Sequence, residues 1–99
     1  MLIETKITSD FHEDISLSCN YDHLTQKYYM PHLSIGGEEY DNEEWLLQLY
    51  TDLESGVKSE HYKKLKKDLI ANGVEKPKHT IREIGLMLLQ GINMKFFQE

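Results

Sequence analysis

The chain has 99 residues, a formal net charge of −6 at neutral pH and a hydrophobic fraction of 39%. This length predicts a single domain, residues 1–99, and the composition excludes a disordered or low-complexity chain. The single cysteine, Cys19, excludes an intrachain disulfide and a cysteine-rich zinc site. We expect no cofactor.

The N-terminal residues indicate a protein that stays in the cytoplasm. The segment MLIETKITSDF carries charges at Glu4, Lys6 and Asp10, so it lacks the apolar core of a secretory signal. The longest strongly apolar run, Ile84–Leu89, is much shorter than a bilayer-spanning helix. We therefore expect a soluble cytoplasmic protein with no membrane partner.

Two strands are predicted before residue 23. Leu2–Thr8 has mixed alternation and is the first strand. In the second strand, Ile15, Leu17 and Cys19 alternate with polar residues, which predicts one buried face and one solvent face.

The segment Lys27–Ile35 is the third predicted strand, with Tyr29, Leu33 and Ile35 on one face. Pro31 shares that face and has no N–H to donate, so it predicts an edge strand or a bulge. Gly36-Gly37 then predicts a tight hairpin turn into a short strand at Glu38–Tyr40.

An amphipathic helix over residues 42–55 is the strongest helical signal. Asp41 is its expected N-cap, with Glu44 as the capping-box partner, and Gly56 is its expected end. At 100° per residue, one broad apolar face forms, and we expect Trp45 on that face to be largely buried. The members of the face are Trp45, Leu46, Leu49, Tyr50 and Leu53.

A second helix is predicted over residues 60–71, capped by Ser59 and ended by Asn72-Gly73. Its predicted apolar stripe consists of Tyr62, Leu65, Leu69 and Ile70.

The last helix is expected to start at Thr80, with Glu83 as its capping-box partner. Gly85 would permit close approach of a neighbour, and Gly91 is an alternative end. One apolar face comprises Ile81, Ile84, Leu88, Leu89, Ile92 and Phe96. The helix also has a second apolar side, which comprises Leu86, Met87, Met94 and Phe97. This side predicts that the helix is buried on both sides, or that it binds a partner or a second copy of the chain.

The order of elements predicts the α+β class, with an N-terminal antiparallel β-sheet of three to four strands packed against three C-terminal helices.

Catalytic and metal-binding patterns are weak. His12, Asp14, Asp22 and His23 could be gathered near Cys19 by one strand pair, but their spacing matches no zinc motif. No nucleophile elbow, P-loop or dinucleotide fingerprint is present. We therefore expect neither an enzyme nor a metal site.

Charge is distributed unevenly along the chain. Residues 1–57 carry a net charge of −10 and residues 58–99 a net charge of +4. This asymmetry predicts either a polar partner or attraction between the two halves. One stretch gathers more carboxylates than a helix N-terminus needs, so we expect it to bind a basic protein, with Tyr40 as an aromatic anchor. This acidic surface comprises Glu38, Glu39, Tyr40, Asp41, Glu43 and Glu44.

An alternative surface lies in the basic segment 58–82. Its hydrophobic spacing loosely resembles helix–extended-loop–helix DNA-binding modules of the SAP type, and this resemblance implies phosphate contacts. The net charge of −6 opposes nucleic-acid binding. The residues concerned are Lys63, Lys64, Lys67, Lys76, Lys78 and Arg82.

These observations favour a small acidic protein-binding module. In size and charge the chain resembles immunity proteins, which neutralise basic, nuclease-like toxins by covering the active site, and phage-encoded inhibitors of host nucleases. A nucleic-acid-binding regulator is the alternative, and an assembly protein that dimerises through the last helix is a third hypothesis.

Overall fold

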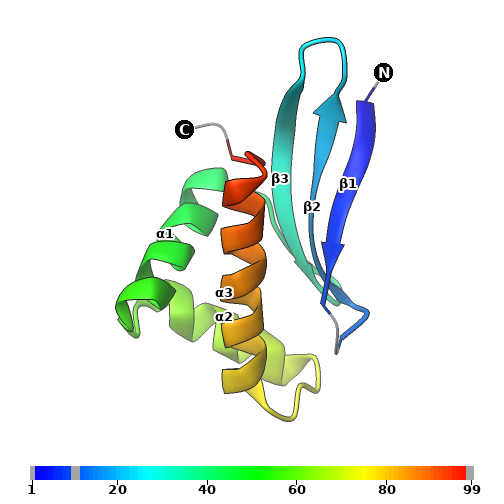
Figure 1. Ribbon diagram of the computed structural model, residues 1–99. Helices are drawn as coiled ribbons and strands as arrows, with labels where there is room; N and C mark the ends of the chain where they lie inside the picture. The colour runs from blue at the N-terminus through cyan, green and yellow to red at the C-terminus, as the bar shows by residue number, and fades with distance from the viewer. Residues whose placement is uncertain (1, 10–11, 98–99) are drawn as a thin grey trace.

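A computed structural model describes residues 2–9 and 12–97. A four-stranded antiparallel sheet is followed by three helices, which confirms the predicted α+β class (Figure 1). The strands are β1 (Leu2–Thr8), β2 (Ile15–Asp22), β3 (Lys27–Ile35) and β4 (Glu38–Tyr40), and the helices are α1 (Glu43–Ser55), α2 (Glu60–Ala71) and α3 (Pro77–Asn93).

The strands pair in the order β1-β2-β3-β4, so each hairpin joins neighbours in the chain. The predicted Gly36-Gly37 turn is confirmed, because Ile35 pairs with Glu38 across it. β4 is short and pairs only with residues 33–35, which leaves the earlier part of β3 at the sheet edge. Within the described part of the chain, β1 pairs with β2 alone and forms the opposite edge.

Pro31 lies beside an irregularity in β3, as its missing N–H predicts. The register of the β2–β3 pair shifts between Ser18 and Asn20, and Met30 has a φ of +54°. The shift reverses the alternation of side chains. Tyr28, rather than the predicted Tyr29, therefore packs against the core.

The start of α1 differs from the prediction by one residue. Asn42, not Asp41, is the N-cap, and its side chain accepts a hydrogen bond from the backbone N–H of Trp45 at 3.0 Å. Glu44 is exposed in the first turn and is not part of a capping box, because such a box needs a glutamate three residues after the cap. Gly56 ends the helix with a φ of +72°, as predicted.

The bounds of α2 are those predicted, and Ser59 caps it by accepting a hydrogen bond from the Tyr62 N–H at 3.4 Å. Leu65 and Leu69 are fully buried. Ile70, the last member of the predicted apolar stripe, is 55% exposed, because it lies about 100° around the helix from buried Leu69.

α3 begins at Pro77, three residues before the predicted cap. Proline suits the first turn, because an N–H is not needed there. Thr80 therefore does not cap the helix; its Oγ1 donates to the Lys76 carbonyl at 3.3 Å. The predicted capping box with Glu83 is wrong for the same reason. The helix also continues through Gly91 to Asn93, so Gly91 is not its end.

The two apolar sides of α3 are only partly covered. Ile84 and Leu88 are fully buried, but Leu89, assigned to the same face, is exposed. On the second side Met87 is buried, whereas Leu86 is 62% exposed. The apolar surface left for a partner is therefore smaller than the sequence predicts.

The hydrophobic core lies between the sheet and the helices. Leu17 and Leu33 contribute from the sheet, and α1, α2 and α3 add leucines and Ile84. Phe96 follows α3, is fully buried and contacts the Tyr28 ring at a centroid distance of 5.0 Å. Trp45 was expected to be largely buried but is half-buried at the edge of this core.

The β2–β3 hairpin extends beyond the helical layer (Figure 1). Its turn, residues 23–26, is exposed, and Leu24 is 78% exposed. The Asp22 carboxylate accepts a hydrogen bond from the Leu24 N–H at 3.0 Å, and this bond lowers the pKa of Asp22.

Candidate functional site

The acidic surface is carried by β4, by the connection after it and by the start of α1. Glu38 and Glu39 lie on β4, Asp41 lies in the connection, and Glu44 lies in the first turn of α1; all four side chains are exposed. Glu43 is half-buried. Among the described residues, the ion pairs within 4.0 Å involve none of the four exposed carboxylates.

Tyr40 does not serve as an exposed anchor, contrary to the sequence-based expectation. Its side chain is only 8% exposed, and its hydroxyl donates to the carboxylate of Asp68 in α2. Its ring stacks on Trp45 at a centroid distance of 4.9 Å, and the Lys64 ammonium lies 5.3 Å from its centroid. Alternation along β4 explains this burial, since Tyr40 pairs with buried Leu33. Tyr40 therefore attaches β4, which carries part of the acidic surface, to α1 and α2.

Asp68 extends the negative charge beneath the acidic surface. Burial, and then the like charge of Glu38, raises the pKa of the Asp68 carboxyl above its ordinary value. The Lys64 ammonium, 3.0 Å from the carboxylate, favours the charged form. Lys64 thus neutralises the charge of Asp68 in its own helix, so it does not neutralise the exposed acids of the acidic surface.

The basic residues predicted as an alternative surface are divided among several places. Lys63 pairs with Glu60 of its own helix at 3.9 Å, and Lys64 pairs with Asp68. The structure places Lys76 and Arg82 beside one cleft and Lys78 with Arg82 beside a second cleft. Lys67 is exposed on α2 and lines neither cleft. These bases therefore do not form one continuous face.

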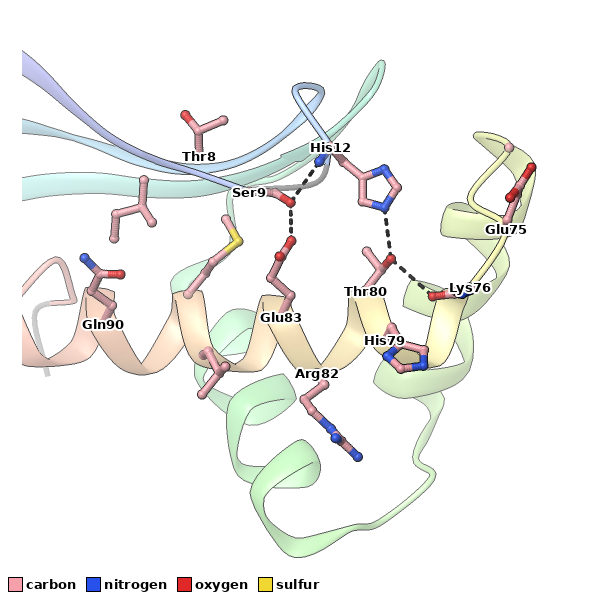
Figure 2. Close-up of a pocket in the computed structure, with 14 residues that line it drawn as sticks. Thr8, Ser9, His12, Glu75, Lys76, His79, Thr80, Arg82, Glu83 and Gln90 are labelled. Atoms are coloured by element: carbon pink, nitrogen blue, oxygen red, sulfur yellow. Dashed lines mark hydrogen bonds between the residues drawn. The ribbon is translucent and has the colours of Figure 1, made fainter.

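The first cleft, of about 870 Å³, separates the end of β1 from α3 (Figure 2). Ser9 donates to the Glu83 carboxylate, and the backbone N–H of His12 donates to the Ser9 hydroxyl at 3.1 Å. His12 Nε2 lies 3.2 Å from Thr80 Oγ1. These contacts fasten the β1–β2 connection to α3.

The Ser9 and Thr80 hydroxyls beside this first cleft are nearly buried and already hydrogen-bonded. Ser9 and Thr80 are 7% and 4% exposed, and the Thr80 hydroxyl donates to a backbone carbonyl. Arg82 points away from Ser9 (Figure 2). Sequence reasoning missed these contacts, because Ser9 and Glu83 are 74 residues apart and neither stands in a motif.

The second cleft, of about 400 Å³, lies among the three helices. Tyr50 and Tyr62 contribute half-buried rings. The charged residues that line this cleft are the cations Lys58, Lys78 and Arg82 and one acid, Glu54. Aromatic rings beside cations are the side chains that contact bases and phosphates in single-stranded nucleic acid.

The polar residues once considered for a metal site are separated. His12 precedes β2, whereas Asp22 ends this strand and His23 follows it, so the two groups lie at opposite ends of an eight-residue strand. Cys19 is buried between them, and burial raises the pKa of its thiol to about 12. Within the described part of the chain, no cluster of three His, Cys, Asp or Glu side chains could hold a metal ion.

Comparisons with models of protein families, with curated proteins and with solved structures found no match for this chain. In the part of the chain that the structure describes, no helix has the length and apolar character needed to cross a membrane.

Proposed function

We propose that this chain is a protein-binding module whose acidic surface contacts a basic protein. The observation that carries the proposal is the run of exposed carboxylates along β4, its connection and the first turn of α1, at Glu38, Glu39, Asp41 and Glu44. Charge of one sign speeds encounter with a partner of opposite sign and disfavours partners of the same sign.

The contacts of the basic half support this proposal. Lys63 and Lys64 pair with acids of their own helix, so these two lysines do not neutralise the acidic surface. The stack of buried Tyr40 on half-buried Trp45 fixes β4 against α1, which presents the carboxylates from a rigid base. A preorganised surface loses less conformational entropy on binding. A basic nuclease-like toxin, covered at its active site by this surface, is the partner class we propose.

The test is a comparison of two double charge reversals. Glu39→Lys/Asp41→Lys changes the acidic surface and keeps the Asn42 cap, while Glu13→Lys/Glu54→Lys makes the same change in net charge at exposed sites elsewhere. A partner recovered from the host with the wild-type chain would be purified and titrated by calorimetry at low and high salt. We expect the first variant alone to weaken binding, by about tenfold or more, and to reduce the salt dependence. Equal affinities for both variants would overturn the proposal.

The second cleft favours one alternative, a nucleic-acid-binding regulator. Its two tyrosines and three cations provide stacking and phosphate contacts within one groove. Fluorescence anisotropy with a single-stranded oligonucleotide would test it, with Lys78→Glu/Arg82→Glu as the variant and Lys63→Glu/Lys67→Glu as the control. Salt-sensitive binding that only the cleft variant loses would support this function over the acidic one.

A further inference from the structure

Among residues 2–9 and 12–97, no strand pairs with the outer edge of β1. The hydrogen-bonding pattern shows which of its residues face outward. Ser9 donates its N–H to the Ile15 carbonyl at 2.9 Å, so these two residues form a hydrogen-bonded pair. Hydrogen-bonded and non-hydrogen-bonded pairs alternate along an antiparallel ladder. In the register that joins Ile7 to Leu17, the odd-numbered residues of β1 therefore bond to β2. The N–H and C=O groups of Glu4, Lys6 and Thr8 point away from the sheet.

The sequence of β1 is nearly symmetric about its central residue. In the segment LIETKIT, Ile3 and Ile7 lie two residues on either side of Thr5, and Glu4 and Lys6 lie next to it. Ile3 and Ile7 point to the helix-facing side of the sheet, as Leu17 does, while the charged pair points to the other side. Ile3 is 51% exposed, and both charged side chains are exposed.

We propose that β1 pairs antiparallel with β1 of a second copy of this chain, centred on Thr5, to form a continuous eight-stranded sheet. Glu4 of each copy then faces Lys6 of the other in hydrogen-bonded pairs, which use the outward backbone groups of both residues. Ile3 of each copy faces Ile7 of the other in non-hydrogen-bonded pairs, where side chains approach most closely.

Charge selects this register over its neighbours. Only even-numbered residues offer outward groups, so the adjacent symmetric registers would centre on Glu4 or on Lys6. The first would place two glutamates face to face and the second two lysines, and like charges opposite each other destabilise a strand pair. A lysine on an edge strand ordinarily discourages pairing, but here its cross-strand neighbour is a glutamate of the second copy.

The helical layer also suits this arrangement. The first cleft runs beside β1 and is lined by Ile7, Leu86 and Met87. A two-fold axis perpendicular to the sheet would put both α3 helices on the same face of the joined sheet, one on each side of the seam. The exposed Leu86 of each copy lines the cleft beside its own β1. A seam of one strand per copy is a small interface, so we expect association in the micromolar to millimolar range.

Sedimentation equilibrium over a concentration series tests the pairing. The wild type should shift from the 11.7 kDa monomer toward the dimer. Glu4→Lys and Lys6→Glu should each weaken self-association about tenfold or more, because each variant opposes like charges at both pairs. An equimolar mixture of the two variants should recover the wild-type association, since every opposed pair is then of opposite sign. Glu13→Lys and Lys58→Glu are controls with the same charge changes at exposed sites elsewhere.

Hydrogen exchange of backbone amides gives a second readout that does not depend on substitution. In the dimer the amides of Glu4 and Lys6 should become protected as concentration rises, whereas those of Thr5 and Ile7 should be protected at all concentrations. Circular dichroism would verify that the variants fold. A wild type that remains monomeric up to millimolar concentration would overturn the proposal. Unchanged association in both variants would overturn it too, and would direct attention to α3 as the interface.

Discussion

At the scale of single residues, Asp52 joins two helices through its side chain. Its carboxylate accepts hydrogen bonds from Ser59 Oγ at 2.5 Å and from Gln48 Nε2 at 3.0 Å, and His61 Nδ1 lies 3.5 Å away. The bond from Ser59, then that from Gln48, and finally the charge of His61 lower the pKa of Asp52 below its ordinary value. Since Ser59 also caps α2, Asp52 fixes the start of one helix to the body of another.

We predict that Asp52→Asn makes the stability of the protein less dependent on acid pH. A carboxyl whose pKa is lower in the folded state stabilises the fold above its unfolded pKa, and this contribution is lost as the pH falls through the folded pKa. The wild type should therefore exceed the variant in unfolding free energy at neutral pH, and the difference should shrink below a pH of about 4. Urea unfolding at a series of pH values would measure it. A difference that stays constant down to acid pH would contradict this role.

Cys19 leads to a second prediction at this scale. The side chain is 1% exposed, and burial raises the pKa of the thiol to about 12, so the reactive thiolate is absent at neutral pH. We expect an aromatic disulfide reagent to leave Cys19 unmodified in the native protein and to label it fully in denaturant. Absorbance of the released thiolate measures both. Rapid, complete labelling under native conditions would show that the Cys19 side chain in β2 is accessible to solvent, which would contradict its burial.

At the scale of elements, two glycines of α3 have different surroundings. A Cβ at Gly91 would lie 2.7 Å from Leu17 Cδ2 and 3.4 Å from the Phe96 ring, whereas a Cβ at Gly85 would meet only Leu53 Cδ1, at 3.5 Å. Leu17 is fully buried and has little room to move. Gly91 thus allows α3 to approach β2. At Gly85 a methyl group would make an ordinary contact with Leu53, so the close approach that its sequence position predicts is not found there.

We predict opposite results for alanine at these two positions. Gly91→Ala should destabilise the fold by about 1–3 kcal/mol through overpacking. Gly85→Ala should be neutral or stabilising by up to about 1 kcal/mol, because alanine has the higher helix propensity and the space is adequate. Chemical denaturation of both variants gives the comparison, with each serving as the control for the other. Similar losses in the two variants would rule out the close approach to Leu17 as the cause.

The sequence predicted the helices and strands well, but it predicted poorly which residues of different elements contact one another. Local signals sufficed for Ser59, Gly56 and the Gly36-Gly37 turn, because caps and hairpin turns depend on near neighbours. The start of α3 was missed, although Pro77 itself indicates a first helical turn. The inward turn of Tyr28 follows from a bulge whose register needs both strands, so no single stretch of sequence encodes it.

The surfaces were harder to predict than the elements. The exposed carboxylates follow directly from composition and position, so four of the six acidic-surface residues could be expected on the outside. Tyr40 could not, because its burial depends on Trp45 and Asp68, which belong to two different helices. The fastening of Ser9 to Glu83 likewise joins segments that only the tertiary structure brings together.

At the scale of the whole molecule, the sheet contains only hairpin connections. Each strand pairs with its neighbours in the chain, and the three helices that follow all pack against one another. Such local connections reduce the loop entropy that must be lost before contacts form.

We therefore predict two-state folding, with a relaxation on the order of milliseconds in the absence of denaturant. The fluorescence of Trp45 reports folding, because its ring contacts Tyr40 of β4 and His61 of α2 and so senses β4, α1 and α2 together. Stopped-flow fluorescence should give single-exponential phases and a V-shaped dependence on denaturant. Fluorescence amplitude missing within the dead time of mixing, or a second refolding phase, would indicate an intermediate.

The protruding β2–β3 hairpin has a practical consequence. Residues 23–26 form an exposed turn, and the hairpin stands clear of the helices (Figure 1). Exposed loop tips are where chains best tolerate inserted peptides. A short epitope or a fluorophore placed between His23 and Leu24 would lie away from β4 and would leave the amides of β1 in place. The protein could thus be immobilised or tracked through this turn, while the acidic surface and the outer edge of β1 remain accessible.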